Sequence, residues 1–300
     1  MLNPNEASIT FAVPYYSKPE LLIETVQSVL KQSRPNWLLN IYDDNPDVPL
    51  DPDLIATYLK DPRVNYHLNS SNLGISGNWN QCLANAHTEL VTILHSDDCL
   101  LPHYIDVVTR LMGNKPNSIA YFCQAQVVDE DGETHFSVVD HVKSHLRAKL
   151  PGNDLSGQSG VTSLLKGNHV ICPTVCYRKS ALGQQHFDSQ WRFVLDLEFF
   201  IRLMIAGATI SGTDEFAYVY RRHRESQTSI LSQNMTRFEE EISYYESMVT
   251  ILNEHDWKAA AETARRKSII KLHLIYLILT DLLQFRFSLV KKRIAVLSKA

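Results

Sequence analysis

Residues 91–102 read VTILHSDDCLLP, an apolar run that ends at two adjacent carboxylates, Asp97 and Asp98, and is closed by a proline. Like charges that lie side by side repel and are costly to bury, so packing alone does not explain such a pair. The run NWLLNIYDD repeats the pattern and ends in Asp43 and Asp44. Each pair follows a pattern typical of a buried strand, which places both pairs at strand ends.

The first hundred residues alternate between strand-like and helical patterns. Strands are predicted at residues 8–16, 36–44, 63–69 and 90–98, and helices at residues 18–33, 54–60, 72–86 and 103–112. Such alternation predicts a parallel sheet with helices on both faces. In sheets of this kind ligands bind beyond the carboxyl ends of the strands, so we expect the two acid pairs to share one rim. A rim that gathers acids suits a hard divalent cation.

The second half of the chain is less regular. The patterns predict an antiparallel hairpin at residues 120–137, a loop or lid at 140–160, helices at 161–168 and 195–207, a strand entering a basic loop at 215–229, and only helices from 231 onward. The hairpin would turn at Asp131 and Gly132, a favoured pair for such turns. Gly167 and Gly207 would end the two helices.

Composition narrows the classes of protein. A net charge of −4 offers no global basic field, so no nucleic-acid partner is expected. Five scattered cysteines without a CxxC motif predict reduced thiols. The N-terminus has no basic segment followed by an apolar one, which predicts no signal peptide. We therefore expect a cytoplasmic protein.

One apolar stretch, residues 269–285, is too interrupted to span a membrane, because Lys271, His273 and Asp281 fall within it. Basic residues flank it on both sides. It predicts either a helix lying peripherally on the anionic inner face of a membrane, or a helix packed on the main domain or on a partner, a second copy of the chain included.

Five blocks follow one another along the chain: VPYY, YDDN, SNLGISGNWNQCL, LHSDD and LDLEFFIRL. Their order and spacing resemble family 2 glycosyltransferases, the inverting enzymes of the A-type nucleotide-sugar-binding fold, over residues 8–225. The resemblance implies an α/β fold with a single Rossmann-like mixed sheet flanked by helices and a C-terminal helical extension. It implies a catalytic domain at 1–228, with a nucleotide-binding half at about 1–102 and an acceptor-binding half at about 103–228, followed by a helical region at 229–300.

In this resemblance the block LHSDD matches the metal-binding Asp-x-Asp motif. Asp97 aligns with the acid that touches the metal, whereas His95 stands where the family has its first acid. His95 can still bond the ribose or diphosphate, and Asp98 can replace the missing carboxylate. The expected cofactor is Mn²⁺ or Mg²⁺, bridging the phosphates of the leaving nucleotide, and Mn²⁺ tolerates an imidazole ligand better.

The other blocks assign the donor and catalytic residues. Asp43 and Asp44 would hold the base and ribose, Tyr15 would stack on the base or belong to the core, and Asn72 and Asn80 would contact the nucleotide or brace the rim. The expected nucleotide-sugar-binding set is Pro14, Tyr15, Asp43, Asp44, Asn72, Gly74, Asn80, His95, Ser96, Asp97 and Arg221. The expected metal set is Asp97, Asp98 and His223.

Asp196 matches the general base, which deprotonates an acceptor hydroxyl as that oxygen attacks the anomeric carbon from the face opposite the diphosphate. An apolar neighbour, Leu195, would help to raise the pKa of this base. Glu198 lies two residues further on and would point elsewhere on a helix. Trp191, just before this helix, could stack on a sugar ring.

The resemblance implies transfer of a hexosyl or N-acetylhexosaminyl group from a UDP-sugar to a saccharide or lipid-linked glycan, in polysaccharide biosynthesis for the cell envelope. Two alternatives stay open. A metal-dependent sugar nucleotidyltransferase is disfavoured because VPYYSKPELL has no glycine. A non-catalytic nucleotide-sugar-binding protein is kept open by His95 and Leu195.

Overall fold

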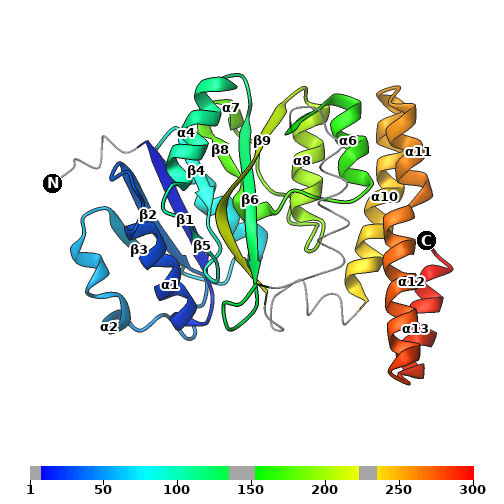
Figure 1. Cartoon of the computed structure of the whole chain (residues 1–300), viewed down its shortest axis with the longest axis horizontal. Helices are drawn as coiled ribbons and strands as arrows, with labels where there is room; N and C mark the ends of the chain where they lie inside the picture. The colour runs from blue at the N-terminus through cyan, green and yellow to red at the C-terminus, as the bar shows by residue number, and fades with distance from the viewer. Residues whose placement is uncertain (1–7, 135–152, 223–234) are drawn as a thin grey trace.

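The computed structural model describes residues 8–134, 153–222 and 235–300 (Figure 1). Its centre is a nine-stranded mixed sheet in the order β3-β2-β1-β4-β8-β6-β9-β5, with β7 paired to β9. The strands are β1 (Ile9–Tyr15), β2 (Trp37–Asp43), β3 (Val64–Leu68), β4 (Leu90–Ile93), β5 (Cys99–Leu100), β6 (Ala120–Val128), β7 (Asp154–Ser156), β8 (Cys176–Arg178) and β9 (Thr209–Arg221).

Strands β1 to β4 are parallel, as the alternation of patterns predicts. Antiparallel β8 then joins this half of the sheet to β6. Helices flank the sheet: α1 (Pro19–Leu30), α2 (Pro52–Ile55), α3 (Gly74–Ala84), α4 (Tyr104–Asn114), α6 (Gly157–Leu165), α7 (Lys179–Leu182) and α8 (Leu195–Ile205). The predicted fold, one mixed α/β sheet with helices around it, is confirmed.

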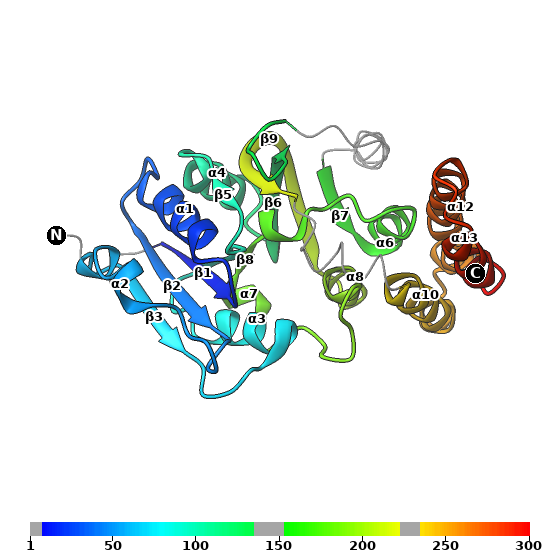
Figure 2. The same cartoon turned by 90° about the horizontal axis from the view of Figure 1, so that it is seen from below.

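Side-chain alternation along β1 sorts the helices into two layers. Phe11 and Val13 belong to a core shared with α1 and α4, whereas Ala12 belongs to a second core shared with α3, α6 and α8. Successive residues of a strand point to opposite faces of the sheet, so β1 contributes side chains to the cores on both faces. Figure 2 shows α1 and α4 on one side of this part of the sheet and α3 on the other.

Two local predictions need correction, and a third is incomplete. Residues 54–60 are not one helix: α2 ends at Ile55 and a 3₁₀ turn covers Tyr58–Lys60. The described part of the 140–160 segment is not a loop, because β7 extends the sheet along β9 and α6 begins at Gly157. The predicted turn at Gly132 is present, and an antiparallel bridge joins Val128 to Thr134, while residues 135–137 of the predicted hairpin lie outside the described residues. The pattern did not predict that β6 also pairs with β9 and β8. These partners are remote in sequence, which local patterns cannot report.

The C-terminal region is helical, as predicted, with α10 (Thr236–Glu254), α11 (Lys258–Arg266), α12 (Ser268–Leu283) and α13 (Phe287–Leu297). Phe238 and Ile242 of α10 lie in the same core as α6 and α8, and the Tyr245 hydroxyl donates to the Leu165 carbonyl at 2.9 Å. This region therefore packs on α6 and α8. Among the described helices, none combines the length and apolar character that a membrane crossing requires.

Candidate active site

The loop after β4 brings His95 together with Asp97 and Asp98, two of the three predicted metal ligands. Ligand atoms of His95, Asp97 and Asp98 lie within 4.8 Å of one another. Asp98 is buried, and its carboxylate accepts from the Tyr218 hydroxyl at 2.9 Å and from the Arg221 amide at 2.8 Å. Burial, with Asp97 beside it, raises the pKa of Asp98. Two residues of β9, more than 100 positions later in the sequence, thus hold the Asp98 carboxylate in place.

His95 has an orphaned polar atom that suits a ligand. Its Nδ1 lies 3.9 Å from the nearer Asp98 oxygen, while its buried Nε2 has no hydrogen-bond partner among the described residues. Burial lowers the pKa of His95, against an opposing effect of Asp97, and so favours the neutral imidazole that binds metals. A buried polar atom without a partner is costly unless something outside the protein completes it. The donor set therefore fits a divalent cation such as Mn²⁺.

The acids that end β2 are engaged within the protein. Asp43 is fully buried and accepts from the amides of Asn45 at 3.0 Å and Leu50 at 2.8 Å and from the Tyr66 hydroxyl at 2.7 Å. These bonds shape the loop beyond β2, so the acid braces the rim. Its contact with a nucleobase stays a prediction.

Asp44 holds the start of α3. One of its oxygens accepts from the Asn69 amide group and from the Leu73 backbone amide, both at 2.8 Å. Asn72 then accepts from the Gly74 amide at 2.8 Å, where a φ of 70° favours glycine. The acid, the asparagine and the glycine thus build one turn at the helix N-terminus. Whether this turn touches a nucleotide stays a prediction.

Among the other residues predicted to bind the nucleotide-sugar, Tyr15 is only 4% exposed. It belongs to the core, which is one of the two interpretations given for it. Burial and nearby Asp43 raise its pKa to about 12. Arg221 contacts Asp98 through its amide, and its guanidinium pairs with Glu24 of α1. Pro14 and Ser96 are half-buried near the ends of β1 and β4. His223 lies outside the described residues.

Asp196 lies in the first turn of α8 and is half-buried. Its Oδ2 accepts from the Asn168 side chain at 2.9 Å, and its Oδ1 accepts from the Leu197 amide at 2.8 Å. Glu198 is 9% exposed and forms an ion pair with Arg202, Nε to Oε1, at 2.6 Å. The two acids of this helix thus differ in environment: Glu198 is committed to a structural pair, and Asp196 is the accessible one.

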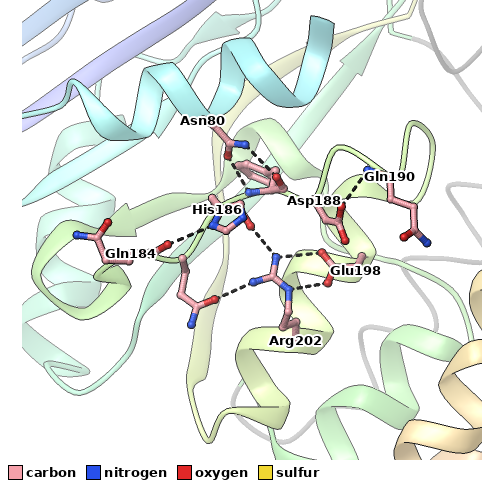
Figure 3. Close-up of polar contacts among 9 residues, drawn as sticks. Asn80, Gln184, His186, Asp188, Gln190, Glu198 and Arg202 are labelled. Carbon is pink, nitrogen blue, oxygen red and sulfur yellow. Dashed lines mark hydrogen bonds and ion pairs between the residues drawn. The ribbon is translucent and has the colours of Figure 1, made fainter. Parts of the chain in front are cut away.

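Side chains from α3 and α8 hold the segment 183–194 that leads into α8 (Figure 3). Asn80 exchanges two hydrogen bonds with the backbone of Phe187, at 2.9 and 2.7 Å. Arg202 donates to the Gln185 side chain at 2.7 Å and to the His186 carbonyl at 2.6 Å. Asn80 therefore braces the segment that leads into α8, and its predicted contact with a nucleotide stays a prediction.

A chain of aromatic rings connects the β4 loop with α8. The Trp79 ring lies 5.2 Å from His95 and 5.1 Å from Phe187, measured between centroids. Phe187 in turn lies 4.2 Å from Phe199, one turn after Asp196 in α8. The two predicted centres, at the end of β4 and at the start of α8, therefore share one continuous packed support.

Glu240 of α10 is a residue that sequence reasoning missed. Its Oε1 accepts from the backbone amides of Arg192, Phe193 and Val194, at 2.9, 2.6 and 2.9 Å. These amides immediately precede α8, where a negative charge also complements the helix dipole. Trp191 packs edge-on against Tyr244 of α10, which gives this ring a structural neighbour. The C-terminal region thus fixes the start of the helix that carries Asp196.

Replacing Glu240 by alanine is expected to lower both stability and activity. Losing a charged helix cap costs about 1–2 kcal/mol, and a misplaced catalytic group can cost up to about 100-fold in rate. Thermal melting and kcat for a nucleotide-sugar reaction would measure both effects. Glu240→Gln keeps an acceptor oxygen and should recover most of each, while Glu239→Ala, at an exposed neighbouring position, serves as the matched control. An alanine variant that matches the control in both measurements would refute the role of Glu240.

Comparison with known proteins identifies the family and the fold. The family model described as "Glycosyl transferase family 2" matches residues 10–177. The chain is 24% identical over 197 residues to the putative colanic acid biosynthesis glycosyl transferase WcaA of Escherichia coli, covering 63% of this chain and 59% of that protein. The match to WcaA thus spans somewhat under two thirds of its length.

Solved structures share the fold at low identity. S. aureus TarS 1–349 in complex with UDP-GlcNAc superposes with a TM-score of 0.60 at 18% identity, covering 82% of this chain and 67% of that one. The mannosyltransferase PcManGT from Pyrobaculum calidifontis, in complex with GDP-Man and Mn²⁺, superposes with a TM-score of 0.61 at 12% identity, covering 99% and 87%. With the family model matching more than half of its length, this chain belongs to glycosyl transferase family 2.

Proposed function

We propose that this glycosyltransferase moves a hexosyl or N-acetylhexosaminyl group from a UDP-sugar to a hydroxyl of a saccharide or lipid-linked glycan, with inversion at the anomeric carbon. The observation that carries the proposal is the cluster of His95, Asp97 and Asp98 beyond β4, supported through Trp79 and Phe187 by the helix that presents Asp196. TarS and PcManGT, the structural neighbours, are described with UDP-GlcNAc and with GDP-Man.

Each residue has a defined task in the proposed reaction. Asp196 accepts the proton of the acceptor hydroxyl as that oxygen attacks, and Asn168 holds the carboxylate in place. Asp97, with His95 and Asp98 beside it, would hold a divalent ion, Mn²⁺ or Mg²⁺; when bound, this ion neutralises charge on the departing diphosphate. Residues at the carboxyl end of β2 would order the nucleotide. The donor would bind to residues 1–102 and the acceptor to residues 103–228.

The acceptor class is proposed from the name of a relative. WcaA is named for colanic acid biosynthesis, which favours a surface polysaccharide, and hence a role in cell-envelope biosynthesis on the cytoplasmic side of the membrane. Sugar specificity depends on a few contacts to sugar hydroxyls. The first experiment is therefore a direct binding assay with several nucleotide-sugar donors.

A thermal-shift titration with UDP, UDP-GlcNAc and GDP-mannose, each with and without Mn²⁺, tests the donor class. A ligand at about 100 times its Kd adds about 2.7 kcal/mol to the free energy of unfolding, or about 5 °C in Tm for a chain of this size. We expect the largest shift for UDP compounds with Mn²⁺, together with slow release of UDP from the UDP-sugar.

Three outcomes would contradict the proposal. The absence of a shift with every nucleotide would exclude the donor site. Pyrophosphate release from UTP and a sugar phosphate would point instead to a nucleotidyltransferase. Donor binding without hydrolysis or transfer under any condition would identify a non-catalytic binding protein.

A further inference from the structure

The hairpin of α12 and α13 concentrates exposed apolar side chains. Half of the large hydrophobic side chains that are exposed in the described part of the chain lie on this hairpin. They are Leu272, Ile275, Tyr276, Leu279, Leu282, Leu283, Phe285, Phe287 and Ile294. Soluble proteins rarely leave a contiguous apolar patch of this kind in water unless it binds something.

The two most exposed of these side chains, Leu283 and Phe285, lie at the turn between the two helices, the hairpin tip formed by residues 282–287. Leu283 is 81% exposed, Phe285 79% and Phe287 57%. Phe285 has a φ of 57°, in the left-handed region that aromatic residues rarely adopt. The fold therefore holds large apolar side chains outward at a turn where a small polar residue would be less strained.

The hairpin tip is rigidly built. The Phe285 amide donates to the Leu282 carbonyl at 3.1 Å and the Arg286 amide to the Asp281 carbonyl at 2.8 Å. Asp281 of α12 forms an ion pair with Arg293 of α13 at 3.0 Å, with side chains only 3% and 10% exposed. This buried pair locks the two helices together, so the exposed tip is a fixed surface and not a frayed chain end.

Charge decides which occupant suits this surface. Asp281 is the only acid between residues 267 and 300, and it is buried. The exposed charges there are all positive: Arg286, Lys291, Lys292 and Lys299. A second copy paired across a two-fold axis through this surface would bring these like charges together, which is unfavourable. An anionic lipid surface instead satisfies both the apolar tip and the positive charges.

We propose that the α12–α13 hairpin docks on an anionic membrane surface, inserting Leu283, Phe285 and Phe287 among the lipids while Arg286, Lys291 and Lys292 contact the headgroups. In Figure 1 the hairpin tip lies at the lower edge of the view, the side on which β9 ends. Docking would therefore turn the carboxyl-end rim toward the membrane. If the proposed function holds, this orientation brings a lipid-linked acceptor to the site.

Co-sedimentation of the full chain with lipid vesicles tests the docking. We expect binding to phosphatidylglycerol-rich vesicles, much weaker binding to pure phosphatidylcholine, and a loss of about tenfold or more in partition for Leu283→Ser/Phe285→Ser and for Lys291→Gln/Lys292→Gln. Ile251→Ser is the matched control, since Ile251 is 38% exposed on α10 outside the hairpin. Circular dichroism and melting would establish that each variant is folded.

Each other outcome overturns the proposal. If the parent protein does not bind anionic vesicles, it has no membrane-docking surface. If the Leu283→Ser/Phe285→Ser variant binds as well as the parent, the interaction is non-specific charge attraction. A dimer in light scattering that Leu283→Ser/Phe285→Ser dissociates would make a second copy the occupant. Hydrolysis of the donor in solution should be unchanged in the tip variants, so a failure of docking and a failure of the proposed function give different results.

Discussion

Replacing Asp196 by asparagine is expected to lower kcat by about 10²–10⁴-fold, the range that removal of a general base produces. Asparagine has nearly the same shape and keeps an oxygen that can accept from Asn168, so α8 should stay folded. It cannot take up the proton of the acceptor hydroxyl. Steady-state kinetics with a saturating donor and acceptor would measure the loss, and donor titration should give an almost unchanged Kd.

Glu198→Gln is the matched control for this experiment, because it makes the same chemical change two residues along the same helix. This variant weakens the ion pair with Arg202 and should reduce Tm more than it reduces kcat. If Asp196→Asn transfers as fast as the parent, or if Glu198→Gln is the slower of the two, the base has been assigned to the wrong acid.

Asp97→Asn is expected to produce the second largest effect. A divalent ion contributes several kcal/mol of charge stabilisation to a departing diphosphate, so losing an anionic ligand should lower kcat by about 10²-fold or more. The measurement pairs kinetics over a range of Mn²⁺ concentrations with the nucleotide thermal shift. The variant should need much more Mn²⁺, and its shift with UDP should become nearly independent of the metal.

The matched control is Asp106→Asn, at an acid that bonds Ser33 and Arg34 at the surface of α4. It should leave the Mn²⁺ dependence unchanged. A parent protein whose activity is the same in excess chelator as in Mn²⁺ would remove the basis for the metal site. Equal Mn²⁺ requirements in Asp97→Asn and the parent would assign the ion to other ligands.

Local patterns were sufficient for the strand ends and for the loop that gathers His95, Asp97 and Asp98. An apolar run that stops at charged residues marks the end of a strand, and parallel strands place such ends on one edge. Local patterns could not tell how deeply each acid is buried or which protein groups bond to it. Asp43 and Asp97 occupy similar positions in the sequence, yet Asp43 is fully buried and bonded to three protein donors.

Local patterns also could not predict contacts between segments that are far apart in the sequence. Glu240 lies 46 residues beyond Val194, and nothing in its own surroundings distinguishes it from the neighbouring glutamates of α10. The pairing of β6 with β9 likewise joins segments about 90 residues apart. Such contacts depend on how whole helices and strands pack together, and the short-range periodicity of a sequence carries no information about this packing.

The sequence by itself determined the α/β alternation, the acids at the strand ends and the helical C-terminus, because each follows from residue order within one or two elements. The candidate base, Asp196, came from the family resemblance and stays a prediction. Only the tertiary structure decided that the C-terminal helices hold the start of α8 and that the α12–α13 hairpin keeps its apolar tip in solvent. Burial and hydrogen bonding are properties of the assembled layers, and the same helical pattern serves an inward or an outward face until its neighbours are placed.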